Sequence, residues 1–278
     1  MIIHSDWHIH SEASYDSTLS LEEIAAKSQA FGFRKVGITD HVNYNDRQFL
    51  GDLNRSSELV KAFQKKHPNF VLGVELTPVN REQFAYIAKT GTREGYIPSG
   101  PSDADDITLA CSKEELVALG VRYGIGASHW WTDMTATREQ RHNRDASIRV
   151  WYHQQLWLAC DARVTVLGHP WYHGQALWYE DFTAIPRTMN MEIAAALKEH
   201  GKYVECNSHF FTADAATEKF RNQYAEFLRE LHEMGIPVTY GSDSHSAYAD
   251  SHFAVEKYLS AAGFRDGDIV EIDEKDFW

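Results

Sequence analysis

Histidine and carboxylate side chains recur along this sequence, each group directly after a short apolar run. The groups are Asp6-Trp7-His8-Ile9-His10, Asp40-His41, Glu75, His129, His169 and Asp243-Ser244-His245. Imidazole nitrogen combined with carboxylate oxygen suits Zn²⁺, Mn²⁺ or Fe²⁺, whereas Ca²⁺ and Mg²⁺ prefer sites made of oxygen alone. The residue types therefore predict a site for first-row transition metals.

The spacing of His8 and His10 adds a geometric reason. Residues i and i+2 of a β-strand point to the same side, so both imidazoles would face one direction. A single histidine is more often a surface or hydrogen-bonded core residue than a ligand. We interpret four of the 15 histidines in that way: His67, His142, His200 and His232. Ligand-type residues end six separate segments, and chance would have to place each of them independently. A shared metal site is therefore the better explanation.

Seven short apolar or β-branched segments carry these groups and read as buried parallel strands. They are residues 2–10, 35–41, 70–76, 123–129, 164–170, 202–207 and 238–245. Helix-like stretches separate them, and this alternation predicts an α/β fold of right-handed βαβ units that close into a distorted seven-stranded (β/α)7 barrel. Because the carboxyl ends of barrel strands meet at one face, the residues between Asp6 and His245 would form one cluster there.

Capping residues and helix-spaced apolar residues mark the helices. Ser20 and Ser112 each precede a glutamate by three residues, the pattern of a capping box, and the first of these helices ends at Gly32. We predict further helices at 146–160, 189–200 and 216–234, the last stopping at Gly235.

Length and charge bound the domain organisation and the partners. A chain of 278 residues can bury one large core, so we expect a single domain over residues 1–278, with an inserted loop or hairpin around 77–101 near the mouth. The formal net charge of −13 would repel a phosphate backbone, so nucleic acid is not expected as the main substrate.

Cysteine usage and hydropathy indicate the compartment. The three cysteines are far apart and lack a CxxC spacing, which fits a reducing environment. No basic region followed by an apolar stretch opens the sequence, and no run approaches the roughly 20 apolar residues that span a bilayer. We therefore expect a cytoplasmic protein with no membrane partner.

The ordered motifs resemble those of the PHP (polymerase and histidinol phosphatase) phosphoesterases. The matching segments are DWHIH with SYDS, GITDH, GVEL, GASH, LGHP and YGSDSH. The resemblance implies three divalent transition-metal ions, Zn, Mn or Fe. It implies one ion held by His8, His10, Glu75 and Asp243, a second by Glu75, His129 and His169, and a third by Asp16, His41 and His245. Glu12 is the alternative to Asp16.

Such a centre predicts hydrolysis of a phosphate ester. Two ions that share Glu75 would lie about 3.5–4 Å apart and can activate a bridging hydroxide, which by the resemblance attacks phosphorus. A third cation suits a dianionic phosphoryl group. We expect a phosphatase acting on a small monoester similar to histidinol phosphate, with inorganic phosphate as product. Asp243 or His209 would pass a proton to the leaving group.

Three residues are candidate substrate contacts. Asn207 is similar to the asparagine of a Glu-x-Asn motif in histidinol phosphatases, or it fixes the turn. Arg138 can clamp a phosphate bidentately, or it lies on a solvated helix face. Trp130, like the aromatic residues that follow His169, can line the mouth or close loops over the barrel. The segment SHFFTAD after Asn207 departs from the histidinol phosphatase pattern, so the substrate stays open.

Other functions compete with this prediction. A phosphodiesterase or nuclease of the same family would use the same ligands, although the acidic charge disfavours it. A hydrolase of the amidohydrolase type would hold one or two metals rather than three. A PHP module without catalysis is disfavoured because a competent side chain occupies every expected ligand position.

Overall fold

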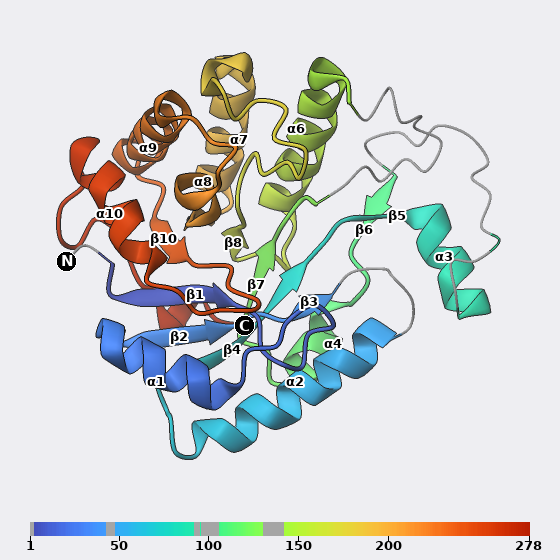
Figure 1. The fold of residues 1–278 in the computed structure, drawn as a ribbon. Coiled ribbons are helices and arrows are strands. Elements are labelled where there is room, and N and C mark those ends of the chain that lie inside the picture. Colours follow the sequence, from blue (N-terminus) through green and yellow to red (C-terminus); the bar gives the residue numbers. More distant parts are fainter. Residues whose placement is uncertain (1–2, 43–47, 92–94, 96–105, 130–141) are drawn as a thin grey trace.

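Seven parallel strands form a nearly closed barrel, as the sequence predicts (Figure 1). The structure is a computed structural model that describes residues 3–42, 48–91, 95, 106–129 and 142–278. In their order around the barrel, the strands are β1 (Ser5–Ile9), β2 (Lys35–Ile38), β4 (Phe70–Leu76), β7 (Tyr123–Gly126), β8 (Val166–Leu167), β9 (Tyr203–Asn207) and β10 (Val238–Gly241). A further short strand, β3 (His41–Val42), also pairs with β4.

The first and last strands meet at a seam. The amide of His10 donates to the carbonyl of Ser244 at 3.0 Å, and the amide of Asp243 donates to the carbonyl of His8 at 2.7 Å. Asp6, which is fully buried, accepts hydrogen bonds from the amide of Ser242 and from the hydroxyl of Tyr248. These bonds bring the two ends of the predicted ligand set together.

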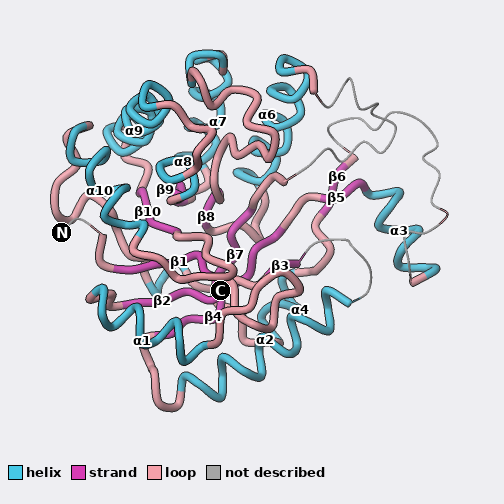
Figure 2. Tube along the Cα trace, in the orientation of Figure 1, coloured by secondary structure: helices cyan, strands magenta, loops and turns pink. Residues whose placement is uncertain are grey.

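Helices surround the barrel (Figure 2). They are α1 (Leu21–Phe31), α2 (Gln48–Gln64), α4 (Lys113–Ala118), α6 (Arg144–Cys160), α7 (Arg187–Glu199), α8 (His209–Thr212), α9 (Glu218–Glu233) and α10 (Ser251–Ala261), with the 3₁₀ turns η1 (Phe182–Ala184) and η2 (Glu274–Asp276). Ser20 caps α1 by accepting from the amide of Glu23, and Gly32 ends it in the left-handed conformation. Ser112 and Glu115 form the predicted capping box of α4. None of the described helices is both long and apolar enough to cross a membrane.

The segment after β4 leaves the barrel, where the sequence predicts an inserted loop or hairpin. Strand β5 (Val79–Asn80) pairs antiparallel with β6 (Ile107–Thr108), apart from the main sheet. Between them lies α3 (Arg81–Thr90), which Figure 1 shows set to one side of the barrel. Residues 92–94 and 96–101 of the predicted insertion lie outside the described residues.

The C-terminal segment closes the amino end of the barrel. Its Phe277 ring lies 6.1 Å from the ring of Tyr123, stacked on it, and 6.3 Å from that of Trp7. The amide of Trp278 donates to the carbonyl of Arg122 at 2.8 Å. Because these groups fill the interior at the amino end of the strands, the carboxyl end of the barrel is the face that remains open for a site.

Candidate metal centre

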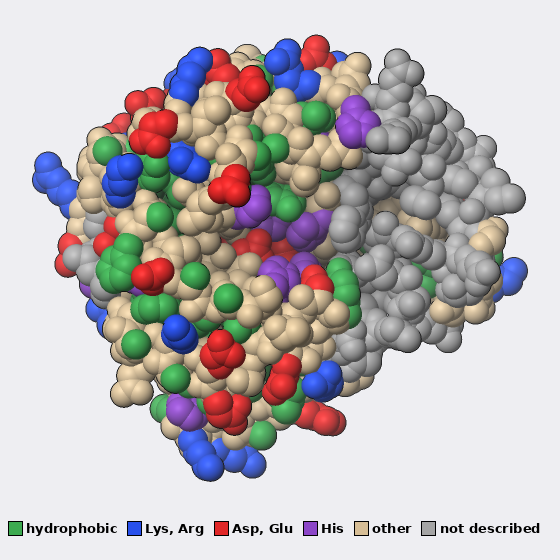
Figure 3. Space-filling view, in the orientation of Figure 1, with side chains coloured by type: hydrophobic (Ala, Val, Ile, Leu, Met, Phe, Trp, Pro, Cys, Tyr) green, Lys and Arg blue, Asp and Glu red, His purple; other side chains and the backbone are tan. Residues whose placement is uncertain are grey.

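The carboxyl ends of the strands bring all nine predicted ligands into one cluster. Figure 3 shows histidine and acidic side chains gathered in a hollow of this face. Glu75 lies in β4, His41 begins β3, and His8 lies in β1. His10 follows β1 directly, His129, His169, Asp243 and His245 lie in the turns just after β7, β8 and β10, and Asp16 comes from the loop between β1 and α1. The barrel aligns the carboxyl ends of its strands, and this brings together residues from six separate parts of the sequence.

Four of these residues form a set whose donor atoms are evenly spaced. The Nε2 atom of His8 lies 3.2 Å from Nε2 of His10 and 3.3 Å from Oε2 of Glu75. Asp243 Oδ1 lies 3.5 Å from the His8 nitrogen and 3.2 Å from the His10 nitrogen. Ligand atoms about 2.0–2.1 Å from a tetrahedral ion lie about 3.3–3.4 Å from one another. The four donors thus fit one such ion.

Glu75 presents its two carboxylate oxygens to different imidazoles. Oε1 lies 2.9 Å from His169 Nε2 and 3.3 Å from His129 Nε2. Oε2 lies 2.9 Å from His41 Nδ1 and 3.3 Å from both His8 and His10. Within the described part of the chain, no group donates a well-aligned hydrogen bond to this buried oxygen. A buried carboxylate oxygen in that state is costly unless a cation binds it, and the arrangement suits a carboxylate shared by two ions.

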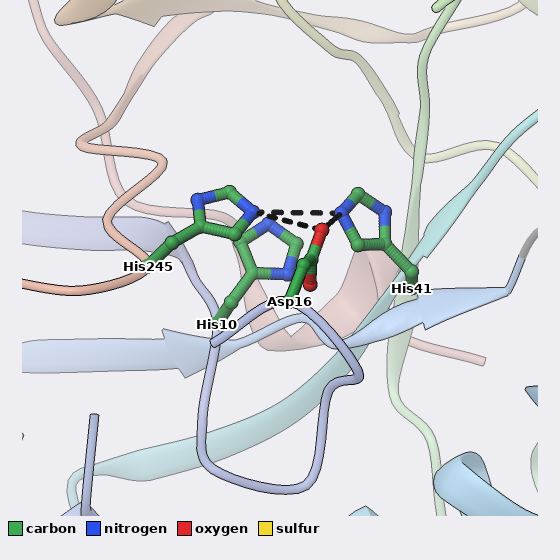
Figure 4. Close-up of side chains that lie close together, drawn as sticks. All are labelled: His10, Asp16, His41 and His245. Carbon is green, nitrogen blue, oxygen red and sulfur yellow. Dashed lines mark hydrogen bonds and ion pairs between the residues drawn. The ribbon is translucent and has the colours of Figure 1, made fainter. Parts of the chain in front are cut away.

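A third set surrounds Asp16. His41 Nε2 lies 3.1 Å and His245 Nε2 lies 3.6 Å from Asp16 Oδ2, with the two nitrogens 3.5 Å apart. Figure 4 shows both rings directed at this carboxylate, with His10 beside them. The hydroxyl of Ser14 donates to Asp16 at 2.7 Å and orients it. Asp16, and not the alternative Glu12, is the carboxylate in this set.

The grouping differs in two ways from the one that the family resemblance implies. His10 belongs to both the first and the third set, and His41 joins Glu75 and His129 in the second. His169, expected in that second set, contacts the same Glu75 oxygen as His129. The rings of His10 and His41 are stacked, with their centroids 4.3 Å apart. The three sets therefore adjoin one another and share side chains.

Three of the histidines form a hydrogen bond through Nδ1, on the side of the ring that faces away from the cluster. Nδ1 of His8 bonds to Oε1 of Glu205 at 2.7 Å, and Nδ1 of His129 lies 3.0 Å from Oγ1 of Thr77. Nδ1 of His245 lies 2.9 Å from the carbonyl oxygen of Asp243. When Nδ1 donates outward in this way, Nε2 keeps its lone pair and faces the centre, as a metal ligand must.

The cluster strongly shifts the pKa values of its members. Burial disfavours the charged form of His41, but the carboxylates of Glu75 and Asp16 outweigh it and raise the pKa of His41 to about 10. Burial likewise opposes ionisation of Glu75 and Asp243, yet the surrounding imidazoles hold both pKa values well below their usual range. Without a metal, protons supply the positive charge that this set of ligands requires.

Two of the predicted ligands lie in left-handed backbone. His169 has φ 23° and Asp243 has φ 55°, whereas non-glycine residues rarely adopt positive φ. Such strain persists where the surrounding structure fixes it, and it is common at functional sites.

The candidate substrate residues have different environments. Asn207 is fully buried, and its amide donates to Glu205 and to Asp243 and accepts from the amide of His209. These partners favour the turn-fixing alternative over a substrate contact. His209 begins α8 at the rim, 5.0 Å from the ring of Tyr172. Burial lowers the pKa of His209, with Asp243 opposing this shift. Trp130 and Arg138 lie outside the described residues.

The aromatic residues after His169 divide between core and mouth. Trp171 and Trp178 are buried, the Trp171 indole donates to Asn190, and the Trp178 indole donates to the Trp171 carbonyl, so these two do not line the mouth. Tyr172 is half-buried, and its ring lies 5.1 Å from that of His169.

Glu205 is a further buried carboxylate beside this cluster, and it is not among the residues predicted from the sequence. It lies two residues before Asn207 on β9. Because positions i and i+2 of a strand share a face, the spacing to Asn207 was the available signal.

Comparison with known proteins gives three findings. The family model of the PHP domain matches residues 6–209. A histidinol phosphate phosphatase from Lactococcus lactis, solved with zinc, L-histidinol and phosphate, shares the fold at a TM-score of 0.66 and 18% identity, covering 100% of this chain and 99% of that one. A 62-residue stretch is 34% identical to a probable phosphatase of Acetivibrio thermocellus. That stretch spans 22% of this chain and 24% of the relative.

Proposed function

Because this chain belongs to the PHP domain family, we propose that it is a metal-dependent phosphoesterase that hydrolyses a small phosphate monoester. The observation that carries the proposal is the two-sided environment of Glu75, with imidazoles at both carboxylate oxygens and Asp243 completing a four-donor set. A carboxylate shared between two ions is the arrangement used for in-line displacement at phosphorus.

The donor sets support three divalent ions as the cofactor. We propose that His8, His10, Glu75 and Asp243 hold one ion, that Glu75, His129 and His169 or His41 hold a second, and that Asp16, His41 and His245 hold a third. Mixed nitrogen and oxygen donors suit zinc, manganese or iron. When bound, these ions would activate a water and neutralise charge on the phosphoryl oxygens.

The chain's own residues would orient the reactants. Asp243 is held by Asn207, which donates to Oδ2 at 3.3 Å, so Oδ1 stays directed toward His8 and His10. Asp243 is therefore placed to accept the proton of the attacking water. His209 lies at the rim beside Tyr172, where it can donate a proton to the departing alkoxide.

Histidinol phosphate is the first substrate that we propose. The similar protein from Lactococcus lactis was solved with L-histidinol and phosphate, and its chain aligns over the whole of this one. In the segment after Asn207, Phe210 and Phe211 are buried in the core, so their side chains are not placed to contact a substrate.

Metal analysis followed by a phosphatase screen tests the proposal. We expect about three transition-metal ions per chain and hydrolysis of small monoesters, including histidinol phosphate, that a chelator abolishes and added Zn²⁺ or Mn²⁺ restores. A protein never exposed to chelator that carries one metal ion or none, or a loaded protein inactive on every monoester, would refute it.

A further inference from the structure

Glu205 is the residue through which β9 reaches the centre. Its side chain is 1% exposed. Oε1 lies 2.7 Å from Nδ1 of His8, on the opposite side of that ring from the Nε2 atom that faces Glu75. The imidazole therefore lies between two carboxylates, and only one of them belongs to the proposed ligand set.

Both oxygens of Glu205 are occupied by donors of the protein. Oε2 accepts from the backbone amide of His169 and, at 3.3 Å, from the side-chain amide of Asn207. Asn207 in turn donates to Asp243. One buried carboxylate thus connects three of the proposed ligands, which come from the ends of β1, β8 and β10.

A glycine in the neighbouring strand β10, Gly241, leaves space for this carboxylate. A Cβ atom at Gly241 would lie 1.8 Å from Oε1 of Glu205 and 2.6 Å from Cβ of His8. Any larger residue at this position of β10 would displace Glu205 from His8. The hydrogen bond between Glu205 and His8 therefore depends on a glycine at this position, where β10 lies close to both side chains.

We propose that Glu205 is a positioning residue, which holds the proton of His8 on Nδ1 so that Nε2 presents its lone pair to the metal ion. Through the His169 amide it also fixes the strained backbone that directs His169 to Glu75. Glu205 does not itself ligate, because protein donors occupy both its oxygens. The inference rests on the proposed function only in that the centre binds metal.

The experiment compares two near-isosteric substitutions by their effect on zinc affinity. Glu205→Met removes the acceptor for His8 and for the His169 amide. Gln155→Met is the matched control, since buried Gln155 accepts from the amide of Trp171 in the same loop and, among the described residues, bonds to no imidazole. Glu205→Gln keeps one acceptor oxygen for His8 and serves if the Met variant does not fold.

Zinc affinity is measured by competition with a chromophoric chelator, beside the unfolding temperature of the metal-free proteins. We expect Glu205→Met to weaken the tightest zinc site by about 10- to 100-fold, Glu205→Gln to weaken it less, and Gln155→Met to stay within about threefold of the native chain. Both Met variants should lower the unfolding temperature, because each leaves a buried amide without its acceptor.

Two results would overturn the inference. One is native-like zinc affinity in every Glu205 variant that folds, and the other is an equal loss of affinity in Gln155→Met. Either would leave the proposed function intact, whereas a native chain that binds none of zinc, manganese and iron would overturn the proposed function as well.

Discussion

The imidazoles of the proposed centre differ in the hydrogen-bond partner of Nδ1. His8 donates to a carboxylate, His129 faces a threonine hydroxyl, and His245 donates to a backbone carbonyl. A carboxylate partner raises the basicity of the ligating nitrogen more than a neutral partner does. The His8 site should therefore bind metal more tightly than the site around His245, whose ring is also more exposed.

Asp243 gives a direct test of the proposed nucleophile site. Asp243→Asn keeps the size of the side chain but removes the negative charge, so a metal ion is bound less tightly and the attacking water loses its proton acceptor. We expect kcat/KM on p-nitrophenyl phosphate to fall by at least about 100-fold, beyond the effect typical of a ligand's outer partners. Circular dichroism should show an unchanged fold. Near-native turnover at equal metal content would remove Asp243 from this role.

The role of His209 can be separated from that of the metal ligands by the choice of leaving group. An alkoxide needs a proton as it departs, whereas p-nitrophenolate does not. If His209 donates that proton, His209→Asn should slow hydrolysis of alkyl monoesters by about 10²- to 10⁴-fold and barely affect p-nitrophenyl phosphate. Equal losses on both substrates would assign His209 to binding. Metal content, measured in parallel, should stay at the native level.

At the level of the elements, strand ends and the turns after them set the positions of the ligands. The seven strands were predictable because each is a short apolar run that ends in polar residues. The orientation of the residues after β8 was not, since Trp171 has φ 69° and turns its indole into the core. Helices α2, α3, α8 and α10 were not predicted individually. In α2, Gly51 near the start weakens the helical pattern.

The convergence of the proposed ligand side chains was predictable from the sequence, but their grouping was not. Alignment at strand ends places His10 at the mouth, but its position between the first and third sets depends on ring stacking against His41 and His245. The partnership of Glu205 with His8 joins residues 197 positions apart. Contacts of this kind arise from tertiary packing, so a strand pattern cannot contain them.

The loop between α6 and β8 gives a prediction about stability and pH. Asp161 ends α6 and accepts from the amide and the guanidinium of Arg163. Burial opposes its charge, but these bonds lower its pKa. A carboxyl with a depressed folded-state pKa stabilises the fold above its unfolded value, about 3.9, and this stabilisation is lost as the pH falls below it.

We therefore expect Asp161→Asn to lower the free energy of unfolding by about 1–2 kcal/mol at pH 7. The difference from the native chain should shrink as the pH falls below about 4. Urea denaturation from pH 7 to pH 3.5 measures it, with exposed Asp214→Asn as the control. A difference that stays constant with pH would show that the carboxylate charge is not what stabilises this loop.

At the scale of the whole molecule, we expect net charge to influence which phosphate esters the protein hydrolyses. The chain carries a formal charge of −13, while the proposed centre gathers several cations at one face. A terminal phosphoryl group brings two negative charges to those cations, and a diester brings one. The surrounding field meanwhile repels long polyanions, an effect that salt screens at about 10 Å in 0.1 M solution.

Hydrolysis should accordingly favour small monoesters over diesters and single-stranded DNA. A side-by-side measurement of kcat/KM at low and high ionic strength tests this. The monoester preference should persist in salt, because the cations act at contact distance, whereas repulsion of DNA should weaken. Faster cleavage of a diester or an oligonucleotide would place the protein in a phosphodiesterase or nuclease branch instead.

The seam between β1 and β10 has a consequence for how the protein folds. Asp6 bonds to the amide of Ser242, 236 positions later, and the first proposed metal set spans the same seam. Contacts of such sequence separation form slowly, because a long loop must close before they give any stabilisation. On the ribosome, His8 and His10 emerge first, and Asp243 is made only after β9 and β10. We therefore expect the proposed four-donor set to form late in folding, so that metal ions would bind to a completed barrel rather than initiate its assembly.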